Sequence, residues 1–297
     1  MFEQFERGDI TIAGNTIHYV RGGSGPALLL LHGHPQTHVI WHKVVATLAR
    51  HFTVIAADLR GYGDSGKPAG LPDHSNYSKR TMAAELVALM AQLGHDEFDL
   101  MGHDRGGRVA YRMALDHPHQ VRRLVVLDIA PTLAMYEQTG REFATRYYHW
   151  FFLIRPAPLP ELLIGGHPGV YLESAIGGGS AGLAPFTPAA YAEYLRCISD
   201  PATIHGICED YRASASIDLE HERADLAAGH KIRCPMLVLW GADGVVGQCF
   251  EPLQEWRRLA ARVDGKALPC GHYIPEQAPQ QLLDEALPFL LAPVAHA

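Results

Sequence analysis

The sequence predicts an α/β fold in which a mostly parallel sheet is flanked by helices on both faces. Several apolar runs, such as ALLLL at 27–31, are continuous rather than alternating, which is typical of strands buried on both faces. These runs alternate with segments of helical spacing, the pattern of a parallel sheet with right-handed crossovers. The alternation stops after Pro131 and resumes near Cys234. A helical segment is therefore predicted between two strands of the sheet.

Eight strands and the helices between them follow from this pattern. The first two strands alternate apolar and polar residues around a turn at Gly14-Asn15, which predicts an antiparallel pair. The predicted strands are DITIAG (9–14), NTIHYV (15–20), PALLLLHGHP (26–35), FTVIAADLRG (52–61), EFDLMGH (97–103), RRLVVLD (122–128), CPMLVLWGAD (234–243) and GKALPCGH (265–272). Helices are predicted over 38–50, 79–93, 106–118 and 251–262, and from Glu276 onward.

The domain organisation follows from the interruption of the pattern. Residues 1–131 and 229–297 form one predicted core domain, and residues 132–228 a helical cap inserted after the sixth strand. The insertion is rich in aromatic residues and contains Pro/Gly-rich breaks at 155–160 and 164–169, without a buried-strand signal. Ligands of such sheets bind at the carboxyl ends of the strands. We expect the cap to lie over these ends and exclude water from the chemistry.

Composition excludes several classes of partner. The net charge of −7 argues against nucleic acid and against an anionic membrane surface. The N-terminus carries acids and no apolar core of a signal peptide, and no apolar run approaches the length of a membrane span. The five cysteines form an odd, widely spaced set without a CxxC pair, which favours free thiols and a cytoplasmic location.

The spacing Gly102-x-Asp104-x-Gly106 indicates a nucleophile on a sharp turn between a strand and a helix. Glycines are expected there because the turn brings backbone and helix close together. A carboxylate at this position is also a good N-terminal cap for the helix, so the turn alone leaves both interpretations open.

A catalytic triad in such a fold needs a late histidine and a second acid. His272 follows the last predicted strand and fits the position of the base. Two acids are candidates to orient it: Asp128, at the end of the sixth strand, and Asp243, in the WGAD stretch after the seventh. We favour Asp128, because Asp243 stands one residue before the usual position of the acid, which is occupied by Gly244.

The HGHP turn at the end of the third strand supplies a predicted oxyanion site. The backbone N–H of His34 and that of Arg105 are expected to form the donor pair. Histidines at 32, 34, 38 and 42 superficially suggest a metal site, but Gln36 and Thr37 stand where an Asp-His ending is required. We therefore expect no metal.

An Asp nucleophile and two neighbouring arginines restrict the reaction. A carboxylate displaces leaving groups at saturated carbon, forming an ester of the enzyme that a His-activated water hydrolyses. This favours alkyl halides or epoxides over esters and peptides. Arg105 and Arg108 lie on one side of the first helical turn, where their guanidinium forks are expected to bind a substrate carboxylate bidentately. An epoxide has no charge for them to bind.

The segments GHDRGGRVAYRMALDHP, HGHPQTHVIWH, LDIAP, YYHWFF and CEDYRA together resemble the fluoroacetate (haloacetate) dehalogenases of the α/β-hydrolase superfamily. The resemblance implies an α/β-hydrolase fold, no cofactor and a homodimer. It assigns Asp104 as nucleophile, Asp128 and His272 as its partners, and Arg105 and Arg108 as carboxylate ligands. It also implies that His149, Trp150 and Tyr211 stabilise the departing halide, although other tyrosines of the insertion compete with Tyr211. His34 departs from the apolar or aromatic residue common in relatives.

The expected function is hydrolytic dehalogenation of a short 2-haloacid such as fluoroacetate or chloroacetate. The nearest alternative is an epoxide hydrolase with the same nucleophile, which would need cap tyrosines to protonate the opening ring. A binding protein on a hydrolase scaffold is a third possibility. An intact set of Asp104, Asp128 and His272 argues against it, because a binder has no use for a water-activating base.

Overall fold

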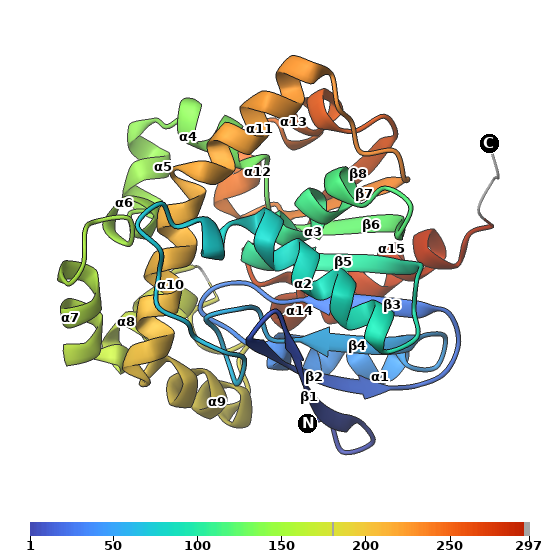
Figure 1. Ribbon diagram of the computed structural model, residues 1–297, viewed down its shortest axis with the longest axis horizontal. Helices are drawn as coiled ribbons and strands as arrows, with labels where there is room; N and C mark the ends of the chain where they lie inside the picture. The colour runs from blue at the N-terminus through green and yellow to red at the C-terminus, as the bar shows by residue number, and fades with distance from the viewer. Residues whose placement is uncertain (180, 294–297) are drawn as a thin grey trace.

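The computed structural model describes residues 1–179 and 181–293 and contains an eight-stranded sheet (Figure 1). The strand order is β1-β2-β4-β3-β5-β6-β7-β8. Strand β2 pairs antiparallel with β1 and β4, and all pairs from β4 to β8 are parallel. The predicted mostly parallel sheet is therefore confirmed. Its strands are β1 (Glu6–Ile12), β2 (Asn15–Gly22), β3 (Ala27–Leu31), β4 (Thr53–Ala57), β5 (Phe98–His103), β6 (Val121–Leu127), β7 (Met236–Gly241) and β8 (Val263–Leu268).

The central strands owe their position to continuous apolar sequence. Every residue of β3, β4 and β5 is buried, because helices cover both faces of the sheet. At the edge, the β1–β2 turn lies at Ala13-Gly14, one residue before the predicted position, and both residues have positive φ. The carboxyl ends of β3, β5, β6 and β8 are followed by His32, Asp104, Asp128 and the loop that carries His272.

Two long helices follow the prediction closely. They are α2 (Lys79–Gln92) and α3 (Arg105–Asp116), which cross the front of the sheet in Figure 1. The predicted helix over 38–50 is wrong as a single element. It consists of a 3₁₀ helix η1 (His38–Lys43) and one α-helical turn, α1 (Val45–Leu48). The segment is rich in β-branched residues, which lower helix propensity.

Helices occupy the stretch between β6 and β7 and lie beyond one end of the strands, at the left of Figure 1. We refer to residues 132–228 as the cap segment and retain its boundaries as a proposed domain division. Its helices are α4 (Thr132–Glu137), α5 (Arg141–Arg146), α6 (His149–Phe152), α7 (Leu159–Gly166), α8 (Pro168–Gly177), α9 (Pro188–Ile198), α10 (Pro201–Ser214) and α11 (Ile217–Ala228).

The C-terminal part completes the sheet with β7 and β8 and four helices. The predicted last helix, from Glu276 onward, begins earlier and is divided at Ala278, because Pro279 restricts the residue before it. The helices are α12 (Val245–Cys249), α13 (Pro252–Leu259), α14 (Ile274–Gln277) and α15 (Pro279–Leu291). Within the described ranges, no helix is both long and apolar enough to cross a membrane.

Candidate active site

Asp104 occupies a strained turn between β5 and α3. Its φ of 45° and ψ of −112° lie in a region that non-glycine residues rarely adopt. The two glycines of the motif are sterically required. A Cβ on Gly102 would lie 2.5 Å from the carbonyl oxygen of Gly106, and a Cβ on Gly106 would lie 2.4 Å from that of His32. The geometry is that of a nucleophile elbow, which presents its side chain away from the sheet.

The carboxylate of Asp104 is buried and held ionised. The backbone N–H of His34 donates a hydrogen bond to its Oδ1 at 3.0 Å. Burial alone would raise the pKa of Asp104, but the nearby charges of His272, Arg105 and Arg108 outweigh burial and hold it well below its usual range. One carboxylate oxygen is thus held by the HGHP turn. The contribution of the Arg105 N–H to this turn stays a prediction.

His272 and Asp128 form the geometry of a base with its orienting acid. His272 Nδ1 lies 2.5 Å from Asp128 Oδ2, and the N–H of Gly241 donates to Asp128 Oδ1 at 2.9 Å. Burial lowers the pKa of His272, but the hydrogen bond and charge of Asp128 raise it by more, so it lies above the ordinary value. Asp243 also borders the cavity, but the contacts described for it use its backbone. The geometry supports Asp128 over Asp243.

The two arginines are completely buried, and most of their nitrogens already have protein partners. Arg105 Nε donates to Asp210 Oδ2 at 2.7 Å, and its Nη2 donates to Asp210 Oδ1 at 3.0 Å and to Ser214 Oγ at 2.6 Å. Arg108 Nη1 donates to Thr132 Oγ1 at 2.9 Å and its Nη2 lies 3.1 Å from Met135 Sδ.

In the part of the chain that the structure describes, Arg105 Nη1 and Arg108 Nε have no hydrogen-bond partner. Binding of a substrate carboxylate by the two guanidinium forks stays a prediction: in the described structure each arginine offers one nitrogen, because the cap segment holds the others. A cation held in this way keeps its charge and its orientation without moving.

Three aromatic side chains of the cap segment surround the same region. His149 and Tyr211 line the cavity, whereas Trp150 is fully buried behind it. The rings of His149 and Trp150 lie 5.8 and 6.3 Å from that of Tyr211. Arg105 stacks over Tyr211 at 4.0 Å and Arg108 over Trp150 at 4.6 Å. Trp150 Nε1 and the Tyr211 hydroxyl are buried donors that have no partner among the described residues.

These side chains surround a cavity of about 190 Å³. Asp104 and His272 line it from the core, and Tyr147, His149 and Tyr211 from the cap segment. Arg105, Arg108 and Trp150 stand behind this lining. Burial lowers the pKa values of His34 and His149 to about 3, so both imidazoles are neutral. A neutral His149 supplies one N–H donor and no charge.

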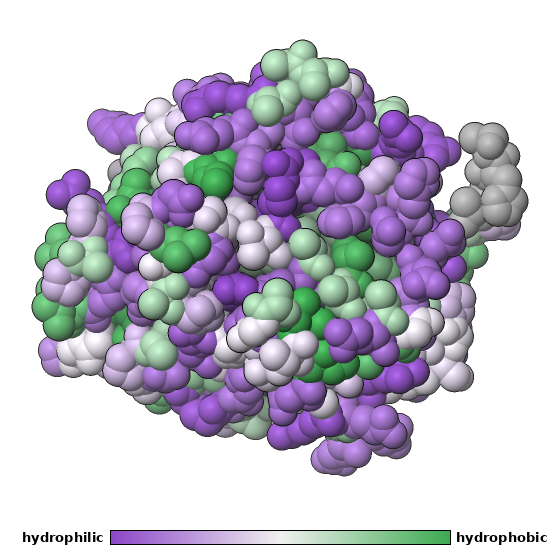
Figure 2. Space-filling model, in the orientation of Figure 1, coloured by the Kyte–Doolittle hydropathy of each residue, from purple (hydrophilic) through white to green (hydrophobic). Residues whose placement is uncertain are grey.

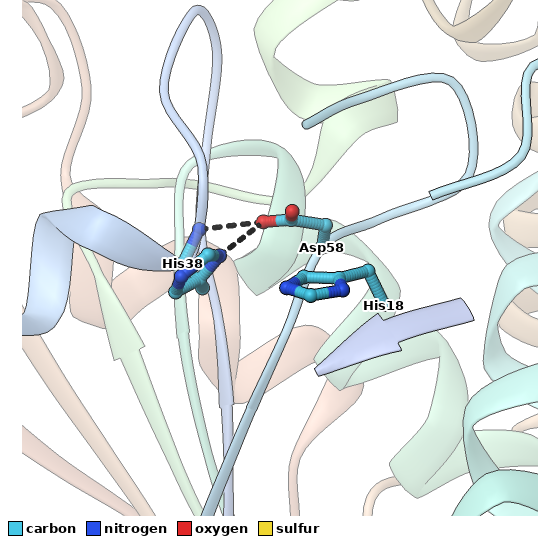
Figure 3. Close-up of side chains that lie close together, drawn as sticks. All are labelled: His18, His38 and Asp58. Carbon is cyan, nitrogen blue, oxygen red and sulfur yellow. Dashed lines mark hydrogen bonds and ion pairs between the residues drawn. The ribbon is translucent and has the colours of Figure 1, made fainter. Parts of the chain in front are cut away.

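A second cluster, of His18, His38 and Asp58, lies outside this cavity (Figure 3). It is the one grouping of three potential metal ligands found among the residues that the structure describes. Asp58 Oδ1 accepts hydrogen bonds from the backbone N–H and the Nδ1 of His38, at 2.7 and 2.9 Å, and Oδ2 accepts one from Asp64 N–H. His18 Nδ1 pairs with Asp9. These contacts are those of a buried ion pair, so we assign no metal to the cluster.

Several residues around the site were not singled out from the sequence. Asp210 holds Arg105, His103 Nε2 lies 2.9 Å from the carbonyl oxygen of His272, and Tyr171 Oη lies 3.0 Å from His34 Nε2. Asp210 directly precedes Tyr211, and His103 directly precedes Asp104. This proximity to a predicted site residue is the one feature of the sequence that points to them. Tyr171 stands in no such motif.

The fold, the elbow and the His–Asp pair define a class of protein. The chain belongs to the α/β-hydrolase family: the family model described as alpha/beta hydrolase fold matches residues 26–175. It is 48% identical to fluoroacetate dehalogenase from Burkholderia sp. over 94% of this chain and 91% of that protein. It is also 36% identical to soluble epoxide hydrolase from Corynebacterium sp. (strain C12), over 94% of each. The crystal structure of ALR0039 from Nostoc sp. PCC 7120 matches with a TM-score of 0.96 and 52% identity, covering 99% of this chain and 100% of that one. The predicted fold and the predicted resemblance are confirmed.

Proposed function

We propose that this hydrolase removes halide from short 2-haloacids, converting fluoroacetate or chloroacetate and water into glycolate and halide through an aspartyl ester. One observation carries the proposal. The ionised Asp104 faces a cavity that is backed by two buried guanidiniums, each with one nitrogen that has no partner among the described residues. A substrate with a carboxylate next to its reacting carbon fits this charge arrangement.

In the first step Oδ2 of Asp104 attacks the α-carbon, and the carbon–halogen bond breaks with its electron pair leaving on the halide. Oδ1 stays hydrogen-bonded to the His34 N–H. In the second step His272 takes a proton from water, and the hydroxide attacks Cγ of Asp104. The oxyanion that forms is Oδ1, held by the same N–H. Cleavage of the ester releases the glycolate oxygen, which takes the proton from His272. The other proton of the attacking water then leaves the Asp104 carboxyl for solvent, which regenerates the carboxylate.

Substrate binding uses the free nitrogens of the arginines. Arg105 Nη1 and Arg108 Nε would each donate to one oxygen of the substrate carboxylate, a two-point clamp made by two side chains. The positive charges also offset the repulsion between the substrate anion and Asp104. Both cations are fixed by the cap segment before substrate arrives, so their ordering costs nothing at that moment.

Halide departure uses neutral donors. Fluoride is small and strongly hydrated, so it leaves a dry site only when hydrogen-bond donors replace its water. His149, Trp150 and Tyr211 would supply an imidazole N–H, an indole N–H and a phenol O–H. The indole and phenol donors are buried without partners among the described residues, which makes them ready to receive an anion.

Epoxide hydrolysis is the alternative, because Asp104 could open an epoxide in the same way. Tyr147, Tyr171 and Tyr211 line the cavity and could protonate an opening ring. However, an epoxide is uncharged and gains nothing from two buried guanidiniums, whose desolvation is costly. This difference leads us to favour a haloacid.

We also propose a cytoplasmic homodimer. The five cysteines are free, as a reducing compartment requires. Leu162 and Leu163 on α7 are 69% and 58% exposed, and green apolar patches lie among hydrophilic residues at this end of the cap segment (Figure 2). Sedimentation velocity tests the dimer. We expect a dimeric wild type and a larger monomer fraction for Leu162→Asp, and a monomeric wild type would contradict the proposal.

Halide release tests the function. The wild type is assayed with fluoroacetate, chloroacetate, a neutral haloalkane and a neutral epoxide, and Asp104→Asn and Asp243→Asn are assayed in parallel. We expect release from the two acids, none by Asp104→Asn, and retained release by Asp243→Asn, the matched control at the cavity rim. Halide release from the haloalkane alone would contradict the role given to the arginines. Turnover of the epoxide alone would favour the alternative.

A further inference from the structure

A tyrosine of the cap segment contacts the predicted base. Tyr147 directly follows α5, and its Oη lies 3.1 Å from Nδ1 of His272, 125 residues further along the chain. The same Nδ1 lies 2.5 Å from Asp128 Oδ2. Tyr147 is buried and lines the cavity together with Asp104 and His272. Neither the predicted triad nor the predicted halide site includes this residue.

The chemistry of the two groups decides which one donates. Nδ1 carries a single proton when it is bonded to Asp128, and it then has no lone pair to accept a bond from a phenol. The Tyr147 oxygen is therefore a second acceptor of the same N–H. Burial raises the pKa of Tyr147 well above its usual value, and the negative charges of Asp128 and Asp104 raise it further, so the oxygen is neutral. A neutral acceptor beside Nδ1 favours the protonated imidazole without adding a charge next to Asp104.

The rings around His272 show what this contact fixes. Tyr273 and His103, both from the core, approach the imidazole with ring centroids at 4.8 and 4.7 Å. Tyr147 approaches from the cap segment, nearly perpendicular, at 5.9 Å. Its own ring packs on Phe143 at 5.4 Å and stacks with Trp150 at 6.3 Å, so the aromatic cluster of the cap holds it in place.

We infer that Tyr147 is a positioning residue for His272: the cap segment supplies a second acceptor that holds the imidazole with Nε2 toward the water that hydrolyses the Asp104 ester. The inference rests on the proposed two-step mechanism. Because His272 acts only in the second step, Tyr147 matters for hydrolysis of the ester and not for its formation. The cap must therefore be seated on the core for the base to be aligned, whereas the nucleophile belongs to the core alone.

Tyr147→Phe removes the oxygen and keeps the ring. Loss of one neutral hydrogen bond predicts that hydrolysis slows roughly 2- to 10-fold. Stopped-flow measurement of the halide burst with chloroacetate separates the steps: the burst rate should stay near that of the wild type while the steady-state rate falls. Protein mass spectra during turnover should show more ester. Loss of the acceptor lowers the pKa of His272, so the acid limb of the steady-state pH profile should move to lower pH.

Tyr148→Phe is the matched control, because Tyr148 is the adjacent tyrosine, has an exposed side chain and makes no described contact with His272. It should leave the ratio of burst to steady-state rate and the acid limb as in the wild type. Thermal melting of both variants checks that they fold.

Two outcomes would overturn the inference while leaving the proposed function intact. One is a Tyr147→Phe variant with wild-type steady-state rate and pH profile. The other is equal slowing of both steps, which would indicate a role in shaping the cavity. If the wild type releases no halide and forms no ester, the proposed function fails, and the inference fails with it.

Discussion

Replacing Trp150 by Phe tests the halide site most sharply, because it separates activity from stability. Trp150 is completely buried, and its Nε1 has no partner among the described residues. The free enzyme therefore bears the cost of a desolvated donor, about 1–3 kcal/mol. In the transition state this donor would bind the departing halide. Phe keeps an aromatic ring under Arg108, which lies 4.6 Å from the Trp150 ring, and removes the donor.

The two effects differ in size. A hydrogen bond to a charged group contributes about 1.5–3 kcal/mol, so the alkylation step should slow roughly 10- to 150-fold. Unfolding should be affected much less. Relief of the unpaired donor offsets the smaller volume of Phe and its weaker cation–π contact, each about 1 kcal/mol. We expect the free energy of unfolding to change by no more than about 1 kcal/mol.

A fluoride electrode and a chloride assay measure the first effect, and urea unfolding measures the second. The loss should be larger for fluoroacetate than for chloroacetate, because fluoride accepts stronger hydrogen bonds. Tyr136→Phe, on a ring 4.9 Å from Trp150, removes another buried donor that has no partner among the described residues and leaves the indole in place, so it shows whether the loss belongs to the indole. A Trp150→Phe variant with wild-type fluoride release, or with equal losses for both halides, would refute the reasoning.

Two further variants test the predicted base and a buried carboxyl on α14. His272→Gln should form the aspartyl ester and fail to hydrolyse it, seen as a lasting increase in protein mass after one release of halide; an unmodified protein would contradict the covalent mechanism. Burial raises the pKa of Glu276 to about 7, although Tyr194 and Lys43 oppose it, so the folded state favours the protonated carboxyl. This stabilisation is complete below the ordinary pKa of 4.5 and is lost as pH rises through about 7, a difference of about 3 kcal/mol. Urea midpoints of Glu276→Gln should then vary less between about pH 5 and pH 8 than those of the wild type; equal variation would assign the dependence to another group.

The fold was predictable because the apolar residues of each strand indicate which of its faces are buried. β3 and β4 are continuous apolar runs, since both faces of the sheet are covered. The division of residues 38–50 into two short helices was not predictable. Their apolar residues fit the spacing of one helix, whereas their β-branched side chains disfavour a long one. The break before Pro279 follows from the sequence, because proline restricts the residue that precedes it.

The site residues that directly follow strands could be predicted from the sequence. The contacts between the cap segment and the core could not. Asp104, Asp128 and His272 converge because parallel strands deliver their carboxyl ends to one edge of the sheet. The partners of Arg105 could not be inferred, because Asp210 lies 105 residues away on a helix whose docking no local pattern specifies. The contact of Tyr147 with His272 has the same origin.

In the proposed function, the unpaired donors are what would let a small cavity distinguish an anion that gives up a halide. Buried polar groups in folded proteins are almost always hydrogen-bonded, yet Arg105 Nη1, Arg108 Nε, Trp150 Nε1 and Tyr211 Oη are among the buried side-chain atoms that lack partners in the described structure. Each costs about 1 kcal/mol or more, and the strained backbone of Asp104 adds a similar amount. A protein partner for any of these donors would have to be displaced by substrate. Tyr211 lines the cavity, whereas Arg105, Arg108 and Trp150 stand behind its lining. In the proposed mechanism, donors that the cap segment already holds in place would be oriented before charge moves from the carboxylate of Asp104 to the halide, which is the condition under which fixed dipoles accelerate a reaction most.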